Sequence, residues 1–513
     1  WRDLPASLAV SGALSILAAC VLLAAGAQAA AGDAARARNV FVMFCLAWLA
    51  AGLLNAAVAG VQVFAPQWAD GNWIARSSLP GRAIGNLRQP NHLCTLLLWA
   101  VIAAIALVQL RVLRPQLVAL VLPVLALALV QTASRTAVVG VILLACWGLL
   151  DRRLRPAARL ALLATPLLYA LAWALMTAWS SWSSGVFAGQ ERLAEADLSS
   201  SRFAIWSDTL GLIRAEPWLG VGFGQFNFAW SLTPFEHRPR AFFDHSHNLL
   251  LQWAAELGVP LALVLVGLLL ATLWRIARAA HQAPSGDDAS CLRAALAMLL
   301  MMAVHSQLEY PLWYLYFLLP TAWLLGFAAT RAAAAAQEDT PAAGAMARRA
   351  RRPWPLPAWS LQLGGFALAL GSLLSVLDYQ RVVVIFDSRS HKPLSQRIQE
   401  GQRSLLFGHH ADYAAATVAP QPERELAAFG RASHYLLDTR LMTAWAEAWA
   451  AKGDLRRAQH LAQRLREFRN PLSDDYFAPC KAAAPAAPAQ PAPTPYQCAA
   501  PGADAPLEWR DFR

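Results

Sequence analysis

The sequence predicts an all-α fold, a polytopic transmembrane helical bundle, on three observations. The chain of 513 residues is 57% hydrophobic and only 15% charged, a balance that ordinary soluble proteins of this length do not have. The apolar residues fall into blocks of about 18 to 25, the length that crosses a hydrocarbon core. Arginines gather in the short stretches between these blocks, as they do at the cytoplasmic ends of membrane helices.

We expect about ten spans, each an apolar block of near-membrane length. They are predicted at 7–29, 39–65, 92–110, 115–131, 135–150, 158–178, 257–277, 290–306, 311–329 and 358–378. Only Thr132–Ser134 separates the fourth and fifth segments, which could instead form a tight helical hairpin. The chain begins at Trp1, so we expect the natural protein to have further residues before it.

The positions of the arginines predict which face of the membrane each loop occupies. Taking 331–356 as cytoplasmic and alternating sides backwards places every other basic loop on the same face, as the positive-inside rule requires. Those loops are 275–289, 151–157, 111–114 and 31–38. The opposite, periplasmic face receives 66–91, the turn at Ser134–Arg135, the loop 179–256, the turn at His305–Tyr310 and the tail 379–513. We therefore expect a multi-pass membrane protein with these segments on one face.

The chain divides by composition into five parts. These are transmembrane helices at 1–178 with the periplasmic loop 66–91, a large periplasmic loop at 179–256, transmembrane helices at 257–378, a small periplasmic helical domain at 379–470 and an Ala/Pro-rich tail at 471–513. Trp445–Glu467 resembles half of a tetratricopeptide (TPR) unit, so the helical domain is predicted to be TPR-like. Ala482–Pro495 is a semi-rigid spacer by its composition. Cys480 and Cys498 are expected to pair if the tail is extracytoplasmic.

The net charge of +11 does not indicate nucleic-acid binding, because no basic patch interleaved with aromatic residues is present. No spacing of cysteine and histidine suggests structural zinc. We expect no cofactor and no metal ligands, with membrane lipids among the partners.

The segment Asp244–Asn248 reads Asp-His-Ser-His-Asn and lies between two predicted spans. Asn248 is expected to cap a helix over 249–257, and Gly258-Val259-Pro260 to break it. His247 would then stand at a positively polarised helix start, where its imidazole stays neutral and can act as a base. The alternatives are a capping cluster without chemistry and, more weakly, a metal site using His245 and His247.

Arginines and amides occupy the same predicted face. A guanidinium at the membrane edge matches phosphate oxygens and stays charged; the arginines there are Arg82, Arg88, Arg135 and Arg202. Pro90 is expected to start a helix and Asn91 to cap it, which leaves Gln89 and Asn86 together unexplained. His305, Glu309 and Tyr310 are ionisable or polar groups at another span end, where such groups indicate function.

These elements, in this order, resemble the O-antigen ligase superfamily of inner-membrane glycosyltransferases. The family's His-Asn, nine residues and a glycine stand here as His247-Asn248, 249–257 and Gly258. QPNH at 89–92 and HSQLEYPLWYLYF at 305–317 are more similar to the PglL-type protein O-oligosaccharyltransferases, or pilin glycosylases. The resemblance covers about 80–380 closely and 380–470 loosely.

The resemblance implies transfer of a preassembled glycan from undecaprenyl pyrophosphate to a Ser/Thr hydroxyl of a periplasmic protein such as pilin. His247 would be the base, and Arg135 and Arg202 would neutralise the leaving pyrophosphate, since no Asp-x-Asp cluster is present to hold Mg²⁺. The remaining residues would bind donor or acceptor: Arg82, Arg88, Gln89, Asn91, His92, His245, Asn248, His305, Glu309 and Tyr310.

Three other functions stay open from the sequence. An O-antigen ligase would use lipid A–core sugar as its acceptor, and a polymerase would join two lipid-linked repeats. A glycan or lipid transporter is a different class, which favours ionisable groups near mid-membrane and internal repeats.

Overall fold

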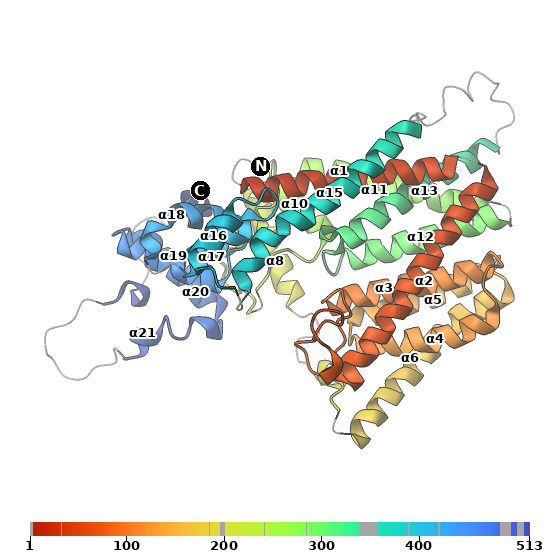
Figure 1. Cartoon of the computed structure of the whole chain (residues 1–513), viewed down its shortest axis with the longest axis horizontal. Helices are drawn as coiled ribbons and strands as arrows, with labels where there is room; N and C mark the ends of the chain where they lie inside the picture. The colour runs from red at the N-terminus through yellow and green to blue at the C-terminus, as the bar shows by residue number, and fades with distance from the viewer. Residues whose placement is uncertain are drawn as a thin grey trace. The chain divides into compact units, whose positions relative to one another are not determined.

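The structure is a computed structural model that describes residues 4–31, 33–183, 185–194, 201–240, 242–283, 285–338, 358–387, 390–418, 421–482, 494–499 and 507–513. Within these ranges the regular elements are helices and no strand occurs. Figure 1 shows the helices in chain order. The all-α prediction is confirmed.

Every predicted span is a helix. Eight helices in the described ranges are long and apolar enough to cross a membrane, which identifies a multi-pass membrane protein. They are α1 (Ala6–Ala31), α2 (Ala34–Phe64), α3 (Pro90–Gln109), α6 (Pro156–Trp182), α11 (Val259–Gln282), α12 (Asp287–His305), α13 (Leu315–Glu338) and α15 (Ala358–Val383). The predicted pair at the fourth and fifth positions forms the shorter α4 (Pro115–Gln131) and α5 (Arg135–Leu150), of 17 and 16 residues.

The start of α13 differs from the prediction. Pro311–Trp313 forms a separate 3₁₀ turn, η2, which ends at Tyr314 in an extended conformation (φ −105°, ψ 125°). The carbonyl of Tyr314 then accepts the first hydrogen bonds of α13, from Phe317 and Leu318 at 2.9 Å each. Proline suits a helix start because its missing N–H would have no partner there, but here it begins the turn instead of the span.

The chain folds as two compact units. We call the described residues within 19–198 and 267–362 the bundle unit, and those within 1–18, 199–266 and 363–513 the tail unit. The helices α1, α11 and α15 each contribute residues to both units.

The bundle unit is built around α3, which packs against α2, α4, α5 and α12 (Figure 1). Its side chains are buried continuously from His92 to Val108, which is why this span shows no polar face. The indole of Trp99 donates to the carbonyl of Met298 at 3.1 Å, joining α3 to α12. Small residues permit close helix packing in membranes, and a Cβ on Gly326 of α13 would meet the backbone of α1.

In the tail unit, the residues from 201 to 256 and the carboxy-terminal helices pack around one hydrophobic core. The segment predicted as a large loop contains four helices: α7 (Ala188–Ala194, in the bundle unit), α8 (Arg202–Ala215), α9 (Phe226–Leu232) and α10 (Leu249–Leu257). The carboxy-terminal helices are α16 (Leu394–Gln402), α17 (Gly408–Val418), α18 (Leu426–Ala432), α19 (Thr439–Ala451) and α20 (Leu455–Phe468).

Trp445–Glu467, which resembles half of a TPR unit in sequence, lies in α19 and α20, and these two helices pack together. Gly453 supplies the left-handed residue of the turn (φ +84°). The side chain of Asp454 then caps α20 by accepting from Arg457 N at 3.0 Å. The Cys480–Cys498 disulfide is also present, whereas most of the Ala/Pro-rich spacer lies outside the described residues.

Candidate functional site

The histidine loop, Asp244–Asn248, leads directly into α10. Asn248 is the N-cap of that helix, and its side-chain oxygen accepts from the backbone N–H groups of Leu250 and Leu251 at 3.1 Å each. The predicted cap is therefore confirmed. His247 precedes the cap in the left-handed region (φ +54°), a strained conformation that is common at functional sites when the surrounding structure imposes it. Its imidazole thus lies beside the positive end of a helix.

A buried relay of hydrogen bonds holds Ser246, the residue before His247. The backbone N–H of Ser246 donates to the side chain of Gln252 at 2.8 Å, and Gln252 donates to Glu256 at 3.0 Å. Glu256 also accepts from the backbone of Phe226 at 3.3 Å. Burial raises the pKa of Glu256 above its ordinary value. The relay connects the loop to the far end of α10 and to the start of α9.

Gly258 has a steric reason to be glycine. Its φ of +81° and ψ of 157° lie in a region that other residues avoid, and a Cβ there would meet the carbonyl oxygen of Trp218. The next residue, Val259, donates to the carbonyl of Pro217 at 2.8 Å. The predicted helix break at Gly258 is confirmed, because α10 ends before it and α11 begins after it.

A carboxylate accompanies the two imidazoles of the loop. Asp244 Oδ1 lies 3.2 Å from His245 Nδ1. Burial alone would raise the pKa of Asp244, but the hydrogen bond and charge of His245 and the charge of His247 outweigh it, so the pKa lies below its usual value. An ionised carboxylate near an imidazole stabilises the imidazolium that forms when the ring accepts a proton. The loop therefore contains an imidazole that could act as a general base and a carboxylate that could stabilise its protonated form.

Arg202 is the first residue of α8, and this helix contacts the histidine loop. Trp206, one turn later, donates from its indole to the carbonyl of Ser246 at 3.0 Å. Residues four apart share a helix face, so Arg202 belongs to the face of α8 that meets the loop.

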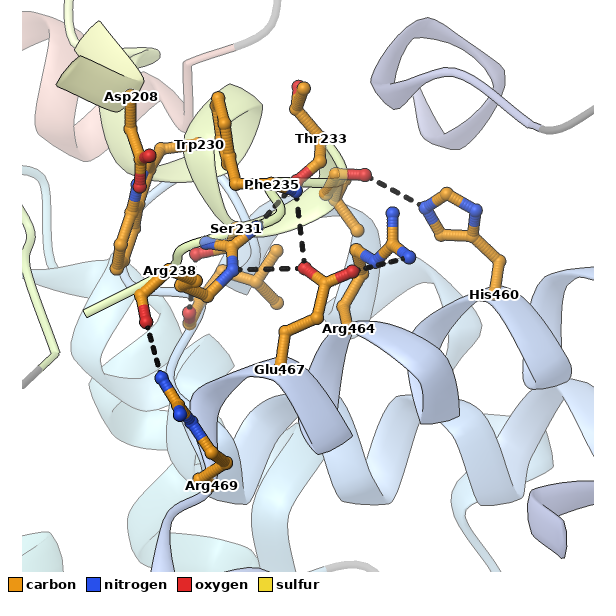
Figure 2. Close-up of polar contacts among 12 residues, drawn as sticks. Asp208, Trp230, Ser231, Thr233, Phe235, Arg238, His460, Arg464, Glu467 and Arg469 are labelled. Carbon is orange, nitrogen blue, oxygen red and sulfur yellow. Dashed lines mark hydrogen bonds and ion pairs between the residues drawn. The ribbon is translucent and has the colours of Figure 1, made fainter. Parts of the chain in front are cut away.

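The segment ahead of the histidine loop is held by α20 through a buried arginine. Arg238 is fully buried, and its Nε lies 3.1 Å from Glu467 of α20. Figure 2 shows Glu467 between Arg238 and Arg464, which pairs with it at 2.7 Å. The guanidinium of Arg238 also lies over the ring of Trp230, 4.6 Å from its centroid. Asp208 accepts from that indole at 2.9 Å, so α8, α9 and α20 meet at one buried network.

In the bundle unit, Asn91 is the centre of a second set of contacts. Its amide donates to Glu309 Oε1 at 2.7 Å and accepts from the Ser134 hydroxyl at 2.6 Å. The expectation that Asn91 caps α3 is wrong. Gln89 is the N-cap and accepts from His92 N at 2.7 Å, because Pro90 occupies the first helical position and leaves Asn91 inside the first turn. Three segments that are distant in sequence therefore meet at Asn91.

The two histidines of this region are held by hydroxyl groups. His92 Nδ1 is hydrogen-bonded to Tyr316 at 2.6 Å, and His305 Nδ1 to Thr95 at 2.7 Å. Their ring centroids are 5.7 Å apart, and both side chains are buried. Tyr310 lies at the edge of the same region, stacked on Tyr314 with centroids 6.0 Å apart.

Two of the predicted arginines lie at the turn between α4 and α5. Arg82 donates from Nε to the carbonyl of Thr132 at 2.9 Å, and Arg135 begins α5 and donates to the carbonyl of Arg192 at 3.2 Å. Arg88 is placed differently: it is exposed, has φ +58°, and donates to Gly71 at 3.2 Å. The turn with Arg82 and Arg135 adjoins Ser134, and so lies next to the Asn91 contacts.

Gln62 is an important residue that the sequence analysis did not select. It is buried in α2, donates to the carbonyl of Ala75 at 2.6 Å, and accepts from the backbone of Ile84 and Gly85 at 2.9 Å each. It thereby shapes the loop that carries Arg82. A single glutamine near the end of an apolar span was the signal available, since polar groups there have a specific role.

The predicted site residues fall into the two units. The tail unit holds His247, Arg202, His245 and Asn248; the bundle unit holds Arg135, Arg82, Arg88, Gln89, Asn91, His92, His305, Glu309 and Tyr310. Each unit assembles most of its own set, and the joining of both sets in one cavity stays a prediction. Among the described residues, no group of three or more His, Cys, Asp or Glu side chains could hold a metal ion.

Comparison with known protein families confirms the predicted resemblance. Residues 118–266 match the O-antigen ligase family, 83–108 match the protein glycosylation ligase family, and 293–472 match the carboxy-terminal part of the virulence factor membrane-bound polymerase family. The chain is therefore similar to the O-antigen ligase superfamily and to its PglL-type branch. The first match includes Arg135, Arg202 and His247.

Two curated relatives come from Acinetobacter baylyi. A ComP-specific O-oligosaccharyltransferase is 28% identical over 50% of this chain and 45% of its own length. A general O-oligosaccharyltransferase is 30% identical over 26% of this chain and 22% of its own length. The matched region thus spans less than half of each relative. No solved structure matches the chain.

Proposed function

We propose that this chain is a protein O-oligosaccharyltransferase of a bacterial inner membrane. It transfers a preassembled glycan from undecaprenyl pyrophosphate to a Ser or Thr hydroxyl of a pilin-like protein, on the periplasmic side. The observation that carries the proposal is the His-Asn, nine-residue, glycine element, which lies within the O-antigen ligase match. In the structure, this element is a strained histidine before a capped helix that ends at an obligatory glycine.

His247 takes the proton from the acceptor hydroxyl as the oxygen attacks the anomeric carbon. The ionised Asp244 stabilises the imidazolium that results. The bond from the anomeric carbon to the pyrophosphate oxygen breaks, and attack from the opposite side inverts that carbon. Arg202 and Arg135 neutralise the charge that develops on the leaving pyrophosphate. A single such contact supplies about 2–4 kcal/mol, or roughly 10²–10³ in rate.

The contacts around Asn91 suit the binding of sugar or acceptor rather than proton transfer. Glu309, Asn91 and Ser134 form a hydrogen-bonded chain in the bundle unit, and amides and carboxylates are the groups that recognise sugar hydroxyls by hydrogen bonds. The Cys480–Cys498 disulfide supports an oxidising compartment for the tail, in agreement with the predicted periplasmic face.

The acceptor is proposed to be a protein because both relatives are named O-oligosaccharyltransferases, one of them ComP-specific. An O-antigen ligase remains the second candidate, since the family description of 118–266 names that activity. A polymerase is the third, on the match at 293–472. These activities share the donor and differ in the acceptor.

The test is co-expression of the full chain with a lipid-linked glycan pathway and a candidate pilin, followed by intact mass spectrometry of the pilin. We expect a pilin carrying the glycan mass with the unchanged chain, and none with His247→Ala. His237→Ala is the matched control, because His237 is exposed and lies ten positions before His247. Glycan on lipid A–core with unmodified pilin would support the ligase, and lengthened lipid-linked glycan would support the polymerase.

A further inference from the structure

The bundle unit contains a cavity away from the residues described above. Its volume is about 510 Å³, within the range of ligand sites. It lies between α3, α5, α11 and α12, and its inner wall is apolar. That wall includes Ile102, Leu143, Trp147, Ala297, Leu300 and Met301.

One end of the cavity is charged. Asp151, Arg152, Arg153 and Arg293 line it there, so three guanidinium groups face one carboxylate. Asp151 is paired with Arg293, Oδ2 to Nε at 3.2 Å. Arg153 donates to the carbonyl of His281, which fixes it without neutralising it. The charged end therefore has an excess of positive charge, and the basic loops predict that it is the cytoplasmic end.

Arg293 lies at an unusual depth. It is six residues after the first residue of α12, Asp287, which corresponds to about 9 Å along the helix axis. Its side chain is only 9% exposed, and its buried Nη1 has no hydrogen-bond partner among the described residues. A buried cationic donor without an acceptor is costly, and a ligand oxygen in the cavity would satisfy it.

We propose that this cavity binds one anionic phospholipid. The phosphate accepts hydrogen bonds from Arg293 and Arg152, and an acyl chain lies along the apolar wall. A phosphodiester carries one negative charge, which offsets part of the excess positive charge left by three arginines and one aspartate. Basic pockets between membrane helices at the cytoplasmic side are suited to such head groups. The site is separate from the proposed transferase chemistry and does not depend on it.

The test is native mass spectrometry of the purified full chain in detergent. The protein is titrated with phosphatidylglycerol and, separately, with phosphatidylethanolamine. We expect the anionic lipid to be retained about fivefold more tightly, because the ammonium of phosphatidylethanolamine cancels the charge of its phosphate and with it a net attraction of about 1 kcal/mol to each nearby arginine. Arg152→Gln should weaken the phosphatidylglycerol complex about fivefold. Arg152 is exposed, so its replacement does not remove a buried group.

Arg114→Gln is the matched control, because Arg114 is an exposed arginine in another basic loop and does not line the cavity. It should bind as the unchanged chain does. Ala297→Trp fills the apolar wall and should lower retention of the lipid without a change of charge. Millimolar inorganic phosphate should not displace the lipid. Equal retention of both lipids, equal weakening by Arg152→Gln and Arg114→Gln, or displacement by phosphate would each overturn the proposal.

Discussion

The pair of the buried Arg238 and the partly exposed Glu467 gives the sharpest test of how the tail unit supports the histidine loop. Glu467→Gln keeps the shape of the side chain and removes its charge. Arg238 is then left fully buried with no ionised partner in direct contact, because its nearest carboxylate at 3.1 Å has gone. The second partner of Glu467, Arg464, is only 8% exposed, so it loses its compensation as well.

The size of the effect follows from this burial. Removing one partner of a buried ion pair costs about 3–5 kcal/mol, since the remaining charge stays out of water. The retained amide oxygen can still accept one hydrogen bond, so we expect the lower end, about 3 kcal/mol. That corresponds to roughly 10²-fold faster opening of the contacts that hold Arg238. The affected segment, 226–240, leads directly into the histidine loop.

The assay is hydrogen–deuterium exchange of the full chain, read by mass spectrometry on peptides covering 226–240 and 244–257. Exchange there should be roughly 10²-fold faster in Glu467→Gln. Glu400→Gln makes the same chemical change in an exposed pair with Lys392 and should leave exchange unchanged. Glu467→Gln combined with Arg238→Met should recover part of the loss. Equal exchange in the two single variants would refute the reasoning.

Three further predictions concern separate parts of the site. Gly258→Ala should lower the free energy of unfolding by about 1–3 kcal/mol for backbone strain alone, and by more because the new Cβ meets the Trp218 carbonyl. Thermal unfolding measures this loss. The control is Gly267→Ala, whose Cβ would meet nothing within 4 Å and which should not destabilise the protein. Arg135→Gln should lower glycan transfer roughly 10²–10³-fold in a single-turnover assay, and a loss no larger than that of Arg159→Gln, which changes an arginine bound to the Gly148 carbonyl, would contradict the role. Burial lowers the pKa of His460 to about 4, against about 6.5 in an unfolded chain. The unfolded state therefore binds more protons between these values, so the tail unit should lose about 3 kcal/mol as the pH falls from 6.5 to 4; denaturant unfolding at several pH values measures this, and the same slope in His460→Gln would contradict the assignment.

The sequence predicted the membrane helices well because their signal is local. Hydrophobic length alone marks a span, and proline at the first helical position marks several of the starts. The cap at Asn248 and the break at Gly258 were also predictable, since both depend on neighbours within ten residues. The start of α13 was misplaced because Pro311 is compatible with a turn as well as with a helix.

The contacts that order the site were not predictable from local pattern. Asn91 looked like a cap, and only the fold shows that it bridges Ser134 and Glu309, which are 43 and 218 positions away. Arg238 was not selected from the sequence, and the fold buries it in contact with Glu467 of α20. The segment 179–256 was predicted as the connection between two spans, with one helix at 249–257. The helices α7, α8 and α9 within it are too short for hydrophobic length to mark them, and α8, α9 and α10 contribute to the core of the tail unit.

One measurement tests the central claim most directly: a cryo-electron microscopy structure of the full chain with undecaprenyl-pyrophosphate-linked glycan bound. We predict that the pyrophosphate oxygens lie within hydrogen-bond distance of Arg135 and Arg202, and that the imidazole of His247 faces the anomeric carbon across the space for an acceptor hydroxyl. A diphosphate bound away from both arginines, or an anomeric carbon beyond the reach of His247, would contradict the account.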